Sequence, residues 1–243
     1  MNRIQPSVRP PHMRPARNDW DIGSAQFSQI TRDVPHVLFA PKHYEPKYAY
    51  PLILWLHGPA DDERQLRRIM PIVSLRNYVA VAPRGMSVGS SHNGPLRWLE
   101  SDEMAAQAEQ RVFDSIDIAW QKYHIAPQRV FVAGFDTGGT MAFHMALNYP
   151  RSFAGVLSFG GAFPTGQMPF RHLDEARRLS VFLASGRDST TYPSQKVCDD
   201  LRLMHSAGLS ITLRQYPCQH ELSPQMLQDM DRWIIEQITR PTE

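Results

Sequence analysis

The feature that most constrains this chain is a glycine-rich segment at residues 134–139, Gly-Phe-Asp-Thr-Gly-Gly, between two apolar segments of different periodicity. Before it, residues 129–133 (Arg-Val-Phe-Val-Ala) form a short, β-branched-rich run typical of a buried strand. After it, apolar side chains recur at helical spacing until Pro150: Met141, Ala142, Met145, Ala146 and Tyr149. Because glycine allows a tight turn and close backbone approach, this pattern predicts a strand, a sharp turn and a helix, with Asp136 at the turn apex.

The other apolar runs alternate between the same two kinds of element. Runs typical of buried or half-buried strands occur at residues 37–40, 52–58, 78–83, 154–159, 181–184 and 211–216. Helical patterns lie between them, at residues 62–75 and 103–124 and after Pro193 and Pro224. Strands that alternate with helices, without an internal repeat, predict an α/β fold: a mostly parallel twisted sheet flanked by helices on both faces.

The N-terminal segment has a different composition. Within residues 1–20, four arginines stand against one aspartate, a charge of +3, whereas the chain as a whole carries +2. The same segment contains four prolines, so it forms neither the apolar core of a signal peptide nor an amphipathic transit helix. We expect residues 1–30 to be a disordered basic Pro/Arg-rich tail, with an interaction arm as the alternative, and residues 31–243 to form a single domain.

Composition excludes several classes of protein. The excess positive charge lies in the tail, so the folded body offers no basic groove for nucleic acid. No run approaches the roughly 20 apolar residues of a membrane span. The two cysteines, Cys198 and Cys218, fit a reducing compartment as free thiols, although the sequence leaves a disulfide open. We therefore expect a cytoplasmic protein.

Several short motifs share their order and spacing with a known family. They are Leu56-His57-Gly58 with Asp62-Glu63-Arg64, Ala82-Pro83-Arg84-Gly85, Arg97-Trp98, residues 133–139, Gly186-Arg187-Asp188, and residues 216–221 (Tyr-Pro-Cys-Gln-His-Glu). Over about residues 34–240 the chain resembles the phospholipase/carboxylesterase branch of the α/β-hydrolase superfamily, which is similar to feruloyl esterases and polyhydroxybutyrate depolymerases. The resemblance implies hydrolysis of small ester-type ligands without a cofactor.

The resemblance also implies a set of catalytic positions. The family uses a serine at the turn apex, an acid after a late strand and a histidine after the last strand. In this chain those positions fall on Asp136, Asp188 and His220, in the chain order nucleophile, acid, base. The alternatives are a turn residue for Asp188 and a solvated loop histidine for His220.

Aspartate at position 136 changes the expected chemistry. A serine hydroxyl gives its proton to the histidine as it attacks, whereas a carboxylate has none to give and attacks ester carbonyls poorly. We expect His220 to lie between two anions, Asp136 and Asp188, both of which favour the imidazolium form. A protonated His220 is not a base, so serine-type acyl transfer is expected to fail.

The oxyanion hole is the second departure from the family. The resemblance assigns it to the backbone N–H groups of Thr137 and of residue 59, which here is proline and has no N–H. Loss of one such donor costs about 10²–10³ in rate. The Ala60 N–H replaces it only if the loop shifts. His92, Arg97 and Trp98 lie in loops where the family shapes its substrate pocket, and we assign them to it, with a plain loop as the alternative.

Two hypotheses remain. The first is a hydrolase-fold protein whose serine-type catalysis is lost or strongly reduced and which binds a small ester-type ligand. The second is an active hydrolase that uses Asp136 as a covalent nucleophile, as haloalkane dehalogenases and epoxide hydrolases do. Against the second, too few residues separate Phe163 from Ser180 for a cap domain, and Thr137 stands where dehalogenases generally have tryptophan. A metal set of Asp136, Asp188 and His220 is a minor alternative, and we expect no metal.

Overall fold

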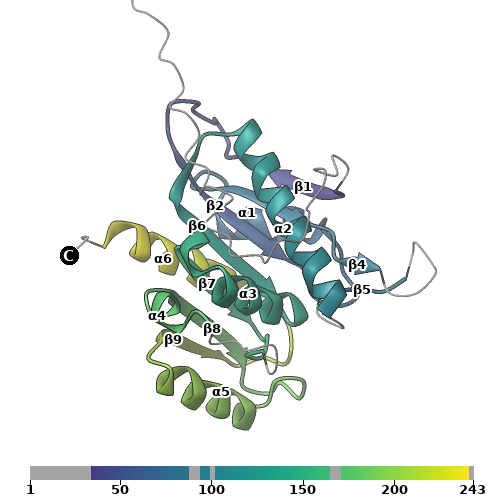
Figure 1. Ribbon diagram of the computed structural model, residues 1–243, viewed down its shortest axis with the longest axis vertical. Coiled ribbons are helices and arrows are strands. Elements are labelled where there is room, and N and C mark those ends of the chain that lie inside the picture. Colours follow the sequence, from purple (N-terminus) through teal and green to yellow (C-terminus); the bar gives the residue numbers. More distant parts are fainter. Residues whose placement is uncertain (1–33, 88–93, 99–101, 165–170, 241–243) are drawn as a thin grey trace, which may run out of the picture.

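The computed structural model describes residues 34–87, 94–98, 102–164 and 171–240. The predicted basic tail and His92 lie outside these ranges. Within the described residues, seven strands form one sheet in the order β1-β3-β2-β6-β7-β8-β9 (Figure 1). These strands are β1 (His36–Phe39), β2 (Tyr50–Leu56), β3 (Val79–Pro83), β6 (Ile125–Phe135), β7 (Gly155–Phe159), β8 (Ser180–Gly186) and β9 (Ser210–Tyr216).

The sheet is parallel except at one edge. Strand β1 pairs antiparallel with β3, and every other neighbouring pair in the sheet is parallel. A separate two-stranded ribbon joins β4 (Met86–Ser87) to β5 (Leu96–Arg97). The predicted α/β fold with a mostly parallel sheet is confirmed.

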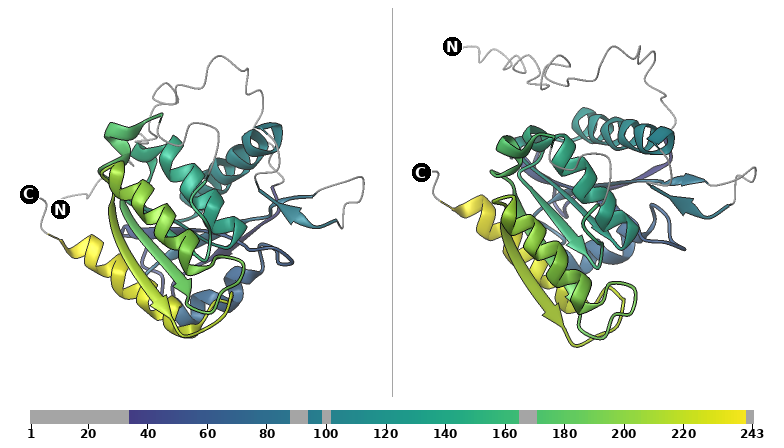
Figure 2. Two further views of the ribbon diagram at one scale, coloured as in Figure 1. Left: turned by 90° about the horizontal axis from the view of Figure 1, so that it is seen from below. Right: turned by 60° about the horizontal axis from the view of Figure 1, so that its bottom comes forward.

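Helices cover both faces of the sheet, as Figure 2 shows from two directions. One face carries α1 (Gln65–Val73) and α6 (Pro224–Thr239), which contact each other. The other carries α2 (Asp102–Lys122), α3 (Thr137–Asn148), the short α4 (Leu173–Ala176) and α5 (Ser194–Ser206). A 3₁₀ turn, η2 (Pro150–Ser152), follows α3.

The alternation of side chains along the strands builds two cores. In β2, Leu52, Leu54 and Leu56 pack with α2 and α3, whereas Ile53 and Trp55 pack with α1 and α6. All five side chains are fully buried. Successive residues of a strand point to opposite faces, so a continuous apolar run is needed wherever both faces are covered. The continuous apolar run at residues 52–58 therefore correctly predicted a strand that is covered on both faces.

Within the described ranges, none of the helices combines the length and the apolar character that a membrane crossing requires.

Candidate active site

The candidate residues gather at one edge of the sheet. Asp136 follows β6, Asp188 follows β8 and His220 follows β9, while Pro59 and Ala60 follow β2. Because these strands are parallel, their carboxyl ends meet at the same edge, where open α/β sheets place their binding crevices. The topology therefore brings together loops that lie far apart in the sequence.

Asp136 occupies the apex of a strained turn between β6 and α3. Its φ of 51° and ψ of −119° are unusual for a residue with a side chain. Its N–H donates to the Phe159 carbonyl at 2.9 Å, and its carbonyl accepts from the N–H groups of Gly139 and Thr140 at 2.8 and 3.0 Å. Such a conformation costs about 1–3 kcal/mol and persists because surrounding bonds impose it.

Two glycines allow the helix to pack at this turn. A Cβ at Gly134 would lie 2.3 Å from the Gly138 carbonyl oxygen, and a Cβ at Gly138 would lie 2.2 Å from that of Leu56. Either side chain would push α3 away from β6 and β2. The Gly-x-Asp-x-Gly spacing therefore fixes how deeply α3 sits between these strands and, with it, the position of Asp136.

His220 lies directly against Asp136. Its Nε2 atom is 2.7 Å from Asp136 Oδ2, and its ring lies 5.2 Å from the ring of Phe135, centroid to centroid. The His220 and Asp136 side chains are 16% and 17% exposed, so solvent reaches both. An ionised carboxylate only accepts hydrogen bonds, so Nε2 carries a proton and donates a hydrogen bond to Oδ2.

The other ring nitrogen of His220 contacts Ser189, a residue that the sequence analysis missed. Nδ1 lies 3.0 Å from Ser189 Oγ, and the same oxygen accepts from the Tyr192 N–H at 3.0 Å. Ser189 is only 5% exposed. It follows β8 in the turn where the acid was expected, one residue later than predicted.

Asp188 forms no ion pair with His220 within the described residues, so the expected contact of the imidazole with two anions is seen for Asp136 alone. The Ser189 N–H donates to the Gly186 carbonyl at 3.3 Å, so residues 186–189 form a β-turn with Arg187 and Asp188 at its exposed tip. Among the described residues, Asp136 is the anion that pairs with His220. One sequence signal pointed to this: in Gly-Arg-Asp-Ser, two charged residues suit the tip of a turn, and the next residue returns toward the sheet.

The predicted oxyanion region lies where α3 begins. Thr137 is the first residue of α3, so its backbone N–H has no partner within the helix. Its hydroxyl oxygen is buried and has no hydrogen-bond partner in the described part of the chain. Ala60 has a φ of 57° and is exposed, and Pro59 before it offers no N–H.

Trp98 packs in the core and supports the β2 loop. Its side chain is 1% exposed, its Nε1–H donates to the His57 carbonyl at 2.9 Å, and the two rings lie 5.0 Å apart. The indole is enclosed, and its predicted part in the substrate pocket stays a prediction. Arg97 pairs with Met86 in the small ribbon.

His57 is itself a structural residue. It is fully buried, its Nδ1 contacts the Gly58 carbonyl at 2.9 Å, and its Nε2 accepts from the Gly85 N–H at 3.0 Å. Burial lowers the pKa of His57, although the nearby carboxylates of Asp61 and Glu63 act in the opposite direction. The neutral imidazole therefore holds the β2 and β3 loops together.

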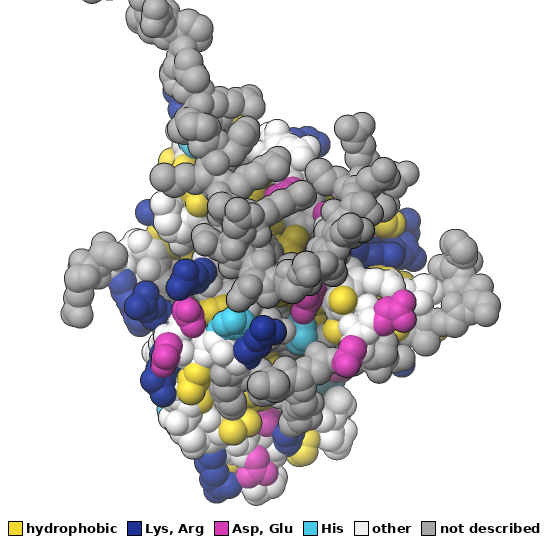
Figure 3. Space-filling view, viewed as in Figure 1, with side chains coloured by type: hydrophobic (Ala, Val, Ile, Leu, Met, Phe, Trp, Pro, Cys, Tyr) yellow, Lys and Arg dark blue, Asp and Glu magenta, His cyan; other side chains and the backbone are white. Residues whose placement is uncertain are grey.

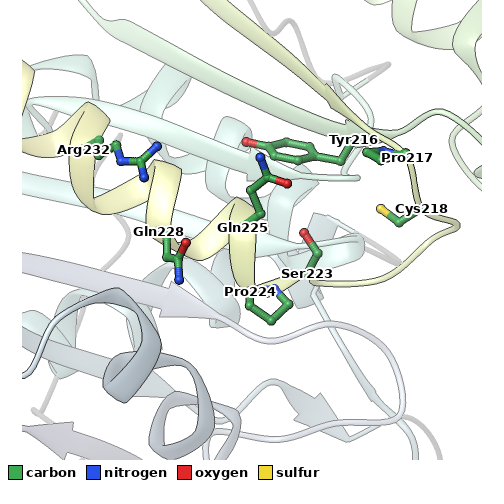
Figure 4. A pocket seen from close by; sticks show the side chains of 8 residues that line it. All are labelled: Tyr216, Pro217, Cys218, Ser223, Pro224, Gln225, Gln228 and Arg232. Atoms are coloured by element: carbon green, nitrogen blue, oxygen red, sulfur yellow. The ribbon is translucent and has the colours of Figure 1, made fainter.

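A surface hollow of about 550 Å³ lies beside the site, between β9 and α6 (Figure 4). Its lining residues are Tyr216, Pro217, Cys218, Ser223, Pro224, Gln225, Gln228 and Arg232. It includes neither Asp136 nor His220, so it is separate from the cluster at the turn. Cys198 and Cys218 are both free, and burial, followed by the charges of Glu221 and Asp188, raises the pKa of the Cys218 thiol.

Metal ligation finds no support in this geometry. In the described ranges, no group of three or more His, Cys, Asp or Glu side chains is placed to hold a metal ion.

On the face shown in Figure 3, basic and acidic side chains are interspersed around apolar patches and histidines.

The sheet order, the strained turn after β6 and the histidine after β9 define an α/β-hydrolase fold. The profile of the Phospholipase/Carboxylesterase family matches residues 45–238, and the chain belongs to this family.

Proteins that are similar to this chain include several that are named as carboxylesterases. A "Probable carboxylesterase" of Oryza sativa subsp. japonica is 23% identical over 201 residues, which cover 75% of this chain and 76% of that protein. The "Probable carboxylesterase SOBER1-like" of Arabidopsis thaliana is 22% identical over 206 residues, 76% of this chain and 78% of its own. The crystal structure of the Bacillus cereus carboxylesterase superposes with a TM-score of 0.67 at 19% identity, covering 85% of this chain and 96% of that one. At this identity the structural likeness concerns the fold.

Proposed function

We propose that this family member binds a small ester-type ligand at the Asp136–His220 site and that its serine-type catalysis is lost or strongly reduced. One observation carries the proposal: the carboxylate at the nucleophile position lies 2.7 Å from the histidine nitrogen that a serine hydroxyl would need. Family membership and the names of the relatives support an ester-type ligand.

The nucleophile is the first missing component. Serine attacks an ester carbonyl because its hydroxyl loses a proton to the histidine as the new bond forms. Asp136 has no such proton, and its negative charge is spread over two oxygens. A carboxylate attack on an ester would also give an anhydride, which is a less stable acyl compound than the ester itself.

The base is the second missing component. Because the Asp136 carboxylate accepts the hydrogen bond, Nε2 of His220 already carries a proton. This holds whether the ring is neutral or cationic, since both forms place a proton on Nε2. The proposal therefore does not depend on a second anion at Asp188.

The oxyanion hole is the third component that is incomplete. Proline at position 59 removes one backbone donor, which in other hydrolases costs about 10²–10³ in rate. The Thr137 N–H remains at the start of α3. One donor supports ligand binding better than it supports stabilisation of a developing oxyanion.

The experiment compares wild type, Asp136→Ser and Asp136→Ser/Pro59→Ala. Each variant is assayed with a short-chain chromogenic ester and with a fluorophosphonate probe that labels activated serines. We expect wild type to stay at the level of heat-denatured protein in both assays. Asp136→Ser should label slowly, and the added N–H at position 59 should raise its rate by roughly 10²–10³.

The competing hypothesis makes a different prediction. If Asp136 is a covalent nucleophile toward an sp³ carbon, water attacks the resulting ester and leaves its oxygen in the carboxylate. Incubation of wild type with short haloalkanes and epoxides in heavy-oxygen water would then label the peptide that contains Asp136. Such labelling, or wild-type ester turnover abolished by Asp136→Ala, would overturn the proposed function.

A further inference from the structure

The imidazole of His220 has one neighbour on each nitrogen. Nε2 lies 2.7 Å from Asp136 Oδ2, and Nδ1 lies 3.0 Å from Ser189 Oγ. In a serine hydrolase triad, the serine hydroxyl is on Nε2 and the aspartate is on Nδ1. The same three residue types are present here, but the serine and the aspartate are at opposite ends.

We propose that Ser189 is the positioning residue of His220, that the site is a Ser-His-Asp triad with its two ends exchanged, and that exchanging them back produces an activated serine at position 136. This inference rests on the proposed function, since it explains how a silent site keeps an ordered histidine. We therefore expect two substitutions, Asp136→Ser and Ser189→Asp, to give this fold an esterase activity.

Ser189 does not act as the nucleophile of a triad used in reverse. Its side chain is enclosed, with 5% of the residue exposed, and its oxygen is already bonded to the Tyr192 N–H. The exposed end of the chain of hydrogen bonds is Asp136 with His220. A ligand therefore meets residue 136, as it would meet the serine in the usual arrangement.

The loop that carries Ser189 is built to hold a hydrogen-bond acceptor. The Tyr192 N–H points at Oγ, and the Tyr192 hydroxyl donates to the buried Asp200 carboxylate at 2.8 Å. A carboxylate at position 189 would accept from the same Tyr192 N–H. With a serine hydroxyl in place of the carboxylate at Nε2, the ring proton can move to Nδ1 and donate to the new carboxylate. Charge is also conserved, because the exchange moves one carboxylate from one end of the imidazole to the other.

The exchange also keeps the total length of the hydrogen-bonded chain. Serine at position 136 is one bond shorter than aspartate, and aspartate at position 189 is one bond longer than serine, so a shift of the imidazole toward position 136 keeps a hydrogen bond at each nitrogen. The turn keeps its position because Gly134, Gly138 and the bond from the Asp136 N–H to Phe159 do not involve the side chain.

The test measures the fluorophosphonate labelling rate of four folded variants. They are Asp136→Ser, Asp136→Ser/Ser189→Asp, Asp136→Ser/Ser189→Asn and Asp136→Ser/Asp188→Asn. Pro59 is present in all four, so its missing N–H cancels in the ratios. Aspartate at position 189 should raise the rate over Asp136→Ser by roughly 10²–10⁴, since replacing the triad aspartate by asparagine in a serine protease costs about 10⁴.

The matched controls separate the charge from the shape of the new residue and from the exposed carboxylate. The asparagine variant should stay within a few-fold of Asp136→Ser, because it lacks the charge that stabilises the imidazolium. Asp188→Asn should leave the rate unchanged, because Asp188 lies at the tip of the turn. The inference is wrong if Ser189→Asp adds nothing and Asp188→Asn removes the activity.

A second measurement needs no activity and no buried charge. In protein labelled with ¹⁵N-histidine, Ser189→Ala should shift the Nδ1 resonance of His220, Ser189→Thr should restore it, and Asp188→Ala should leave it in place. An unchanged Nδ1 resonance in Ser189→Ala would overturn the positioning role even if Ser189→Asp fails to fold. Activity of wild type would refute the proposed function separately, because these ratios and resonances are read whether or not wild type is silent.

Discussion

The loop that positions Ser189 depends on one buried carboxylate, Asp200. It is 2% exposed and lies on α5. Its Oδ2 accepts from the Phe163 N–H and from the Tyr192 hydroxyl, both at 2.8 Å, and its Oδ1 pairs with Lys196 at 2.8 Å. Asp200 therefore ties the loop after β7 to the loop after β8, and we predict that its loss destabilises the protein.

The size of the effect follows from the groups left behind. Asp200→Ala removes the acceptor of two hydrogen bonds, one from the Phe163 N–H and one from the buried Tyr192 hydroxyl, and a buried donor that loses its acceptor costs about 1–3 kcal/mol. Lys196 is 40% exposed and returns to water at little cost. Removing a buried charge relieves part of the penalty, so the free energy of unfolding should fall by about 2–4 kcal/mol. For a domain of this size, that lowers the Tm by roughly 5–15 °C.

Urea unfolding of three variants checks the reasoning. Tyr192→Phe removes one hydrogen bond but leaves Asp200 two partners, so it should cost about 1 kcal/mol. Asp199→Ala is the matched control, since Asp199 is half exposed and its pair with Arg202 is worth at most about 1 kcal/mol. If Asp200→Ala unfolds at the same urea concentration as Asp199→Ala, the carboxylate does not hold these loops.

Two further predictions concern titrating groups. Burial lowers the pKa of His57 in the folded protein. Below about pH 6.5 the unfolded chain therefore binds a proton at His57 that the folded protein does not bind. The free energy of unfolding is highest above that pH and declines as the pH falls toward the lowered pKa. His57→Gln should be less stable than wild type at pH 8 but lose less on acidification, as urea midpoints at pH 8 and 5.5 will reveal; parallel losses would contradict the assignment. Because burial and the charges of Glu221 and Asp188 raise the pKa of Cys218, alkylation by iodoacetamide, followed by peptide mass spectrometry, should be slower at Cys218 than at the exposed Cys198. Asp188→Asn should speed the reaction at Cys218 only, and an equal change at both thiols would argue against a local charge effect.

The fold was largely predictable from local pattern. Apolar runs such as residues 52–58 and 78–83 alternate with helical spacing, and strands of a mostly parallel sheet must be joined by such helices. The glycine pattern around Asp136 predicted the sharp turn, because glycines at positions 134 and 138 let α3 lie against the strands. Short elements without periodicity, such as α4, were not predicted, since four residues carry too little pattern.

The sequence by itself determined the fold, the order of the loops at the carboxyl edge, and the residues at the turn apex and after His57-Gly58, which are Asp136 and Pro59. Only the tertiary structure decided what contacts each nitrogen of His220. A loop such as Gly186-Arg187-Asp188-Ser189 contains both an acid and a hydroxyl, and composition does not say which one faces inward. The β-turn closed by the Ser189 N–H settles this, because it turns Asp188 to solvent and brings Ser189 to the imidazole. The sequence states which residue stands at each position. The direction in which a side chain points at the end of a strand depends, in contrast, on backbone hydrogen bonds to segments that are distant in the chain.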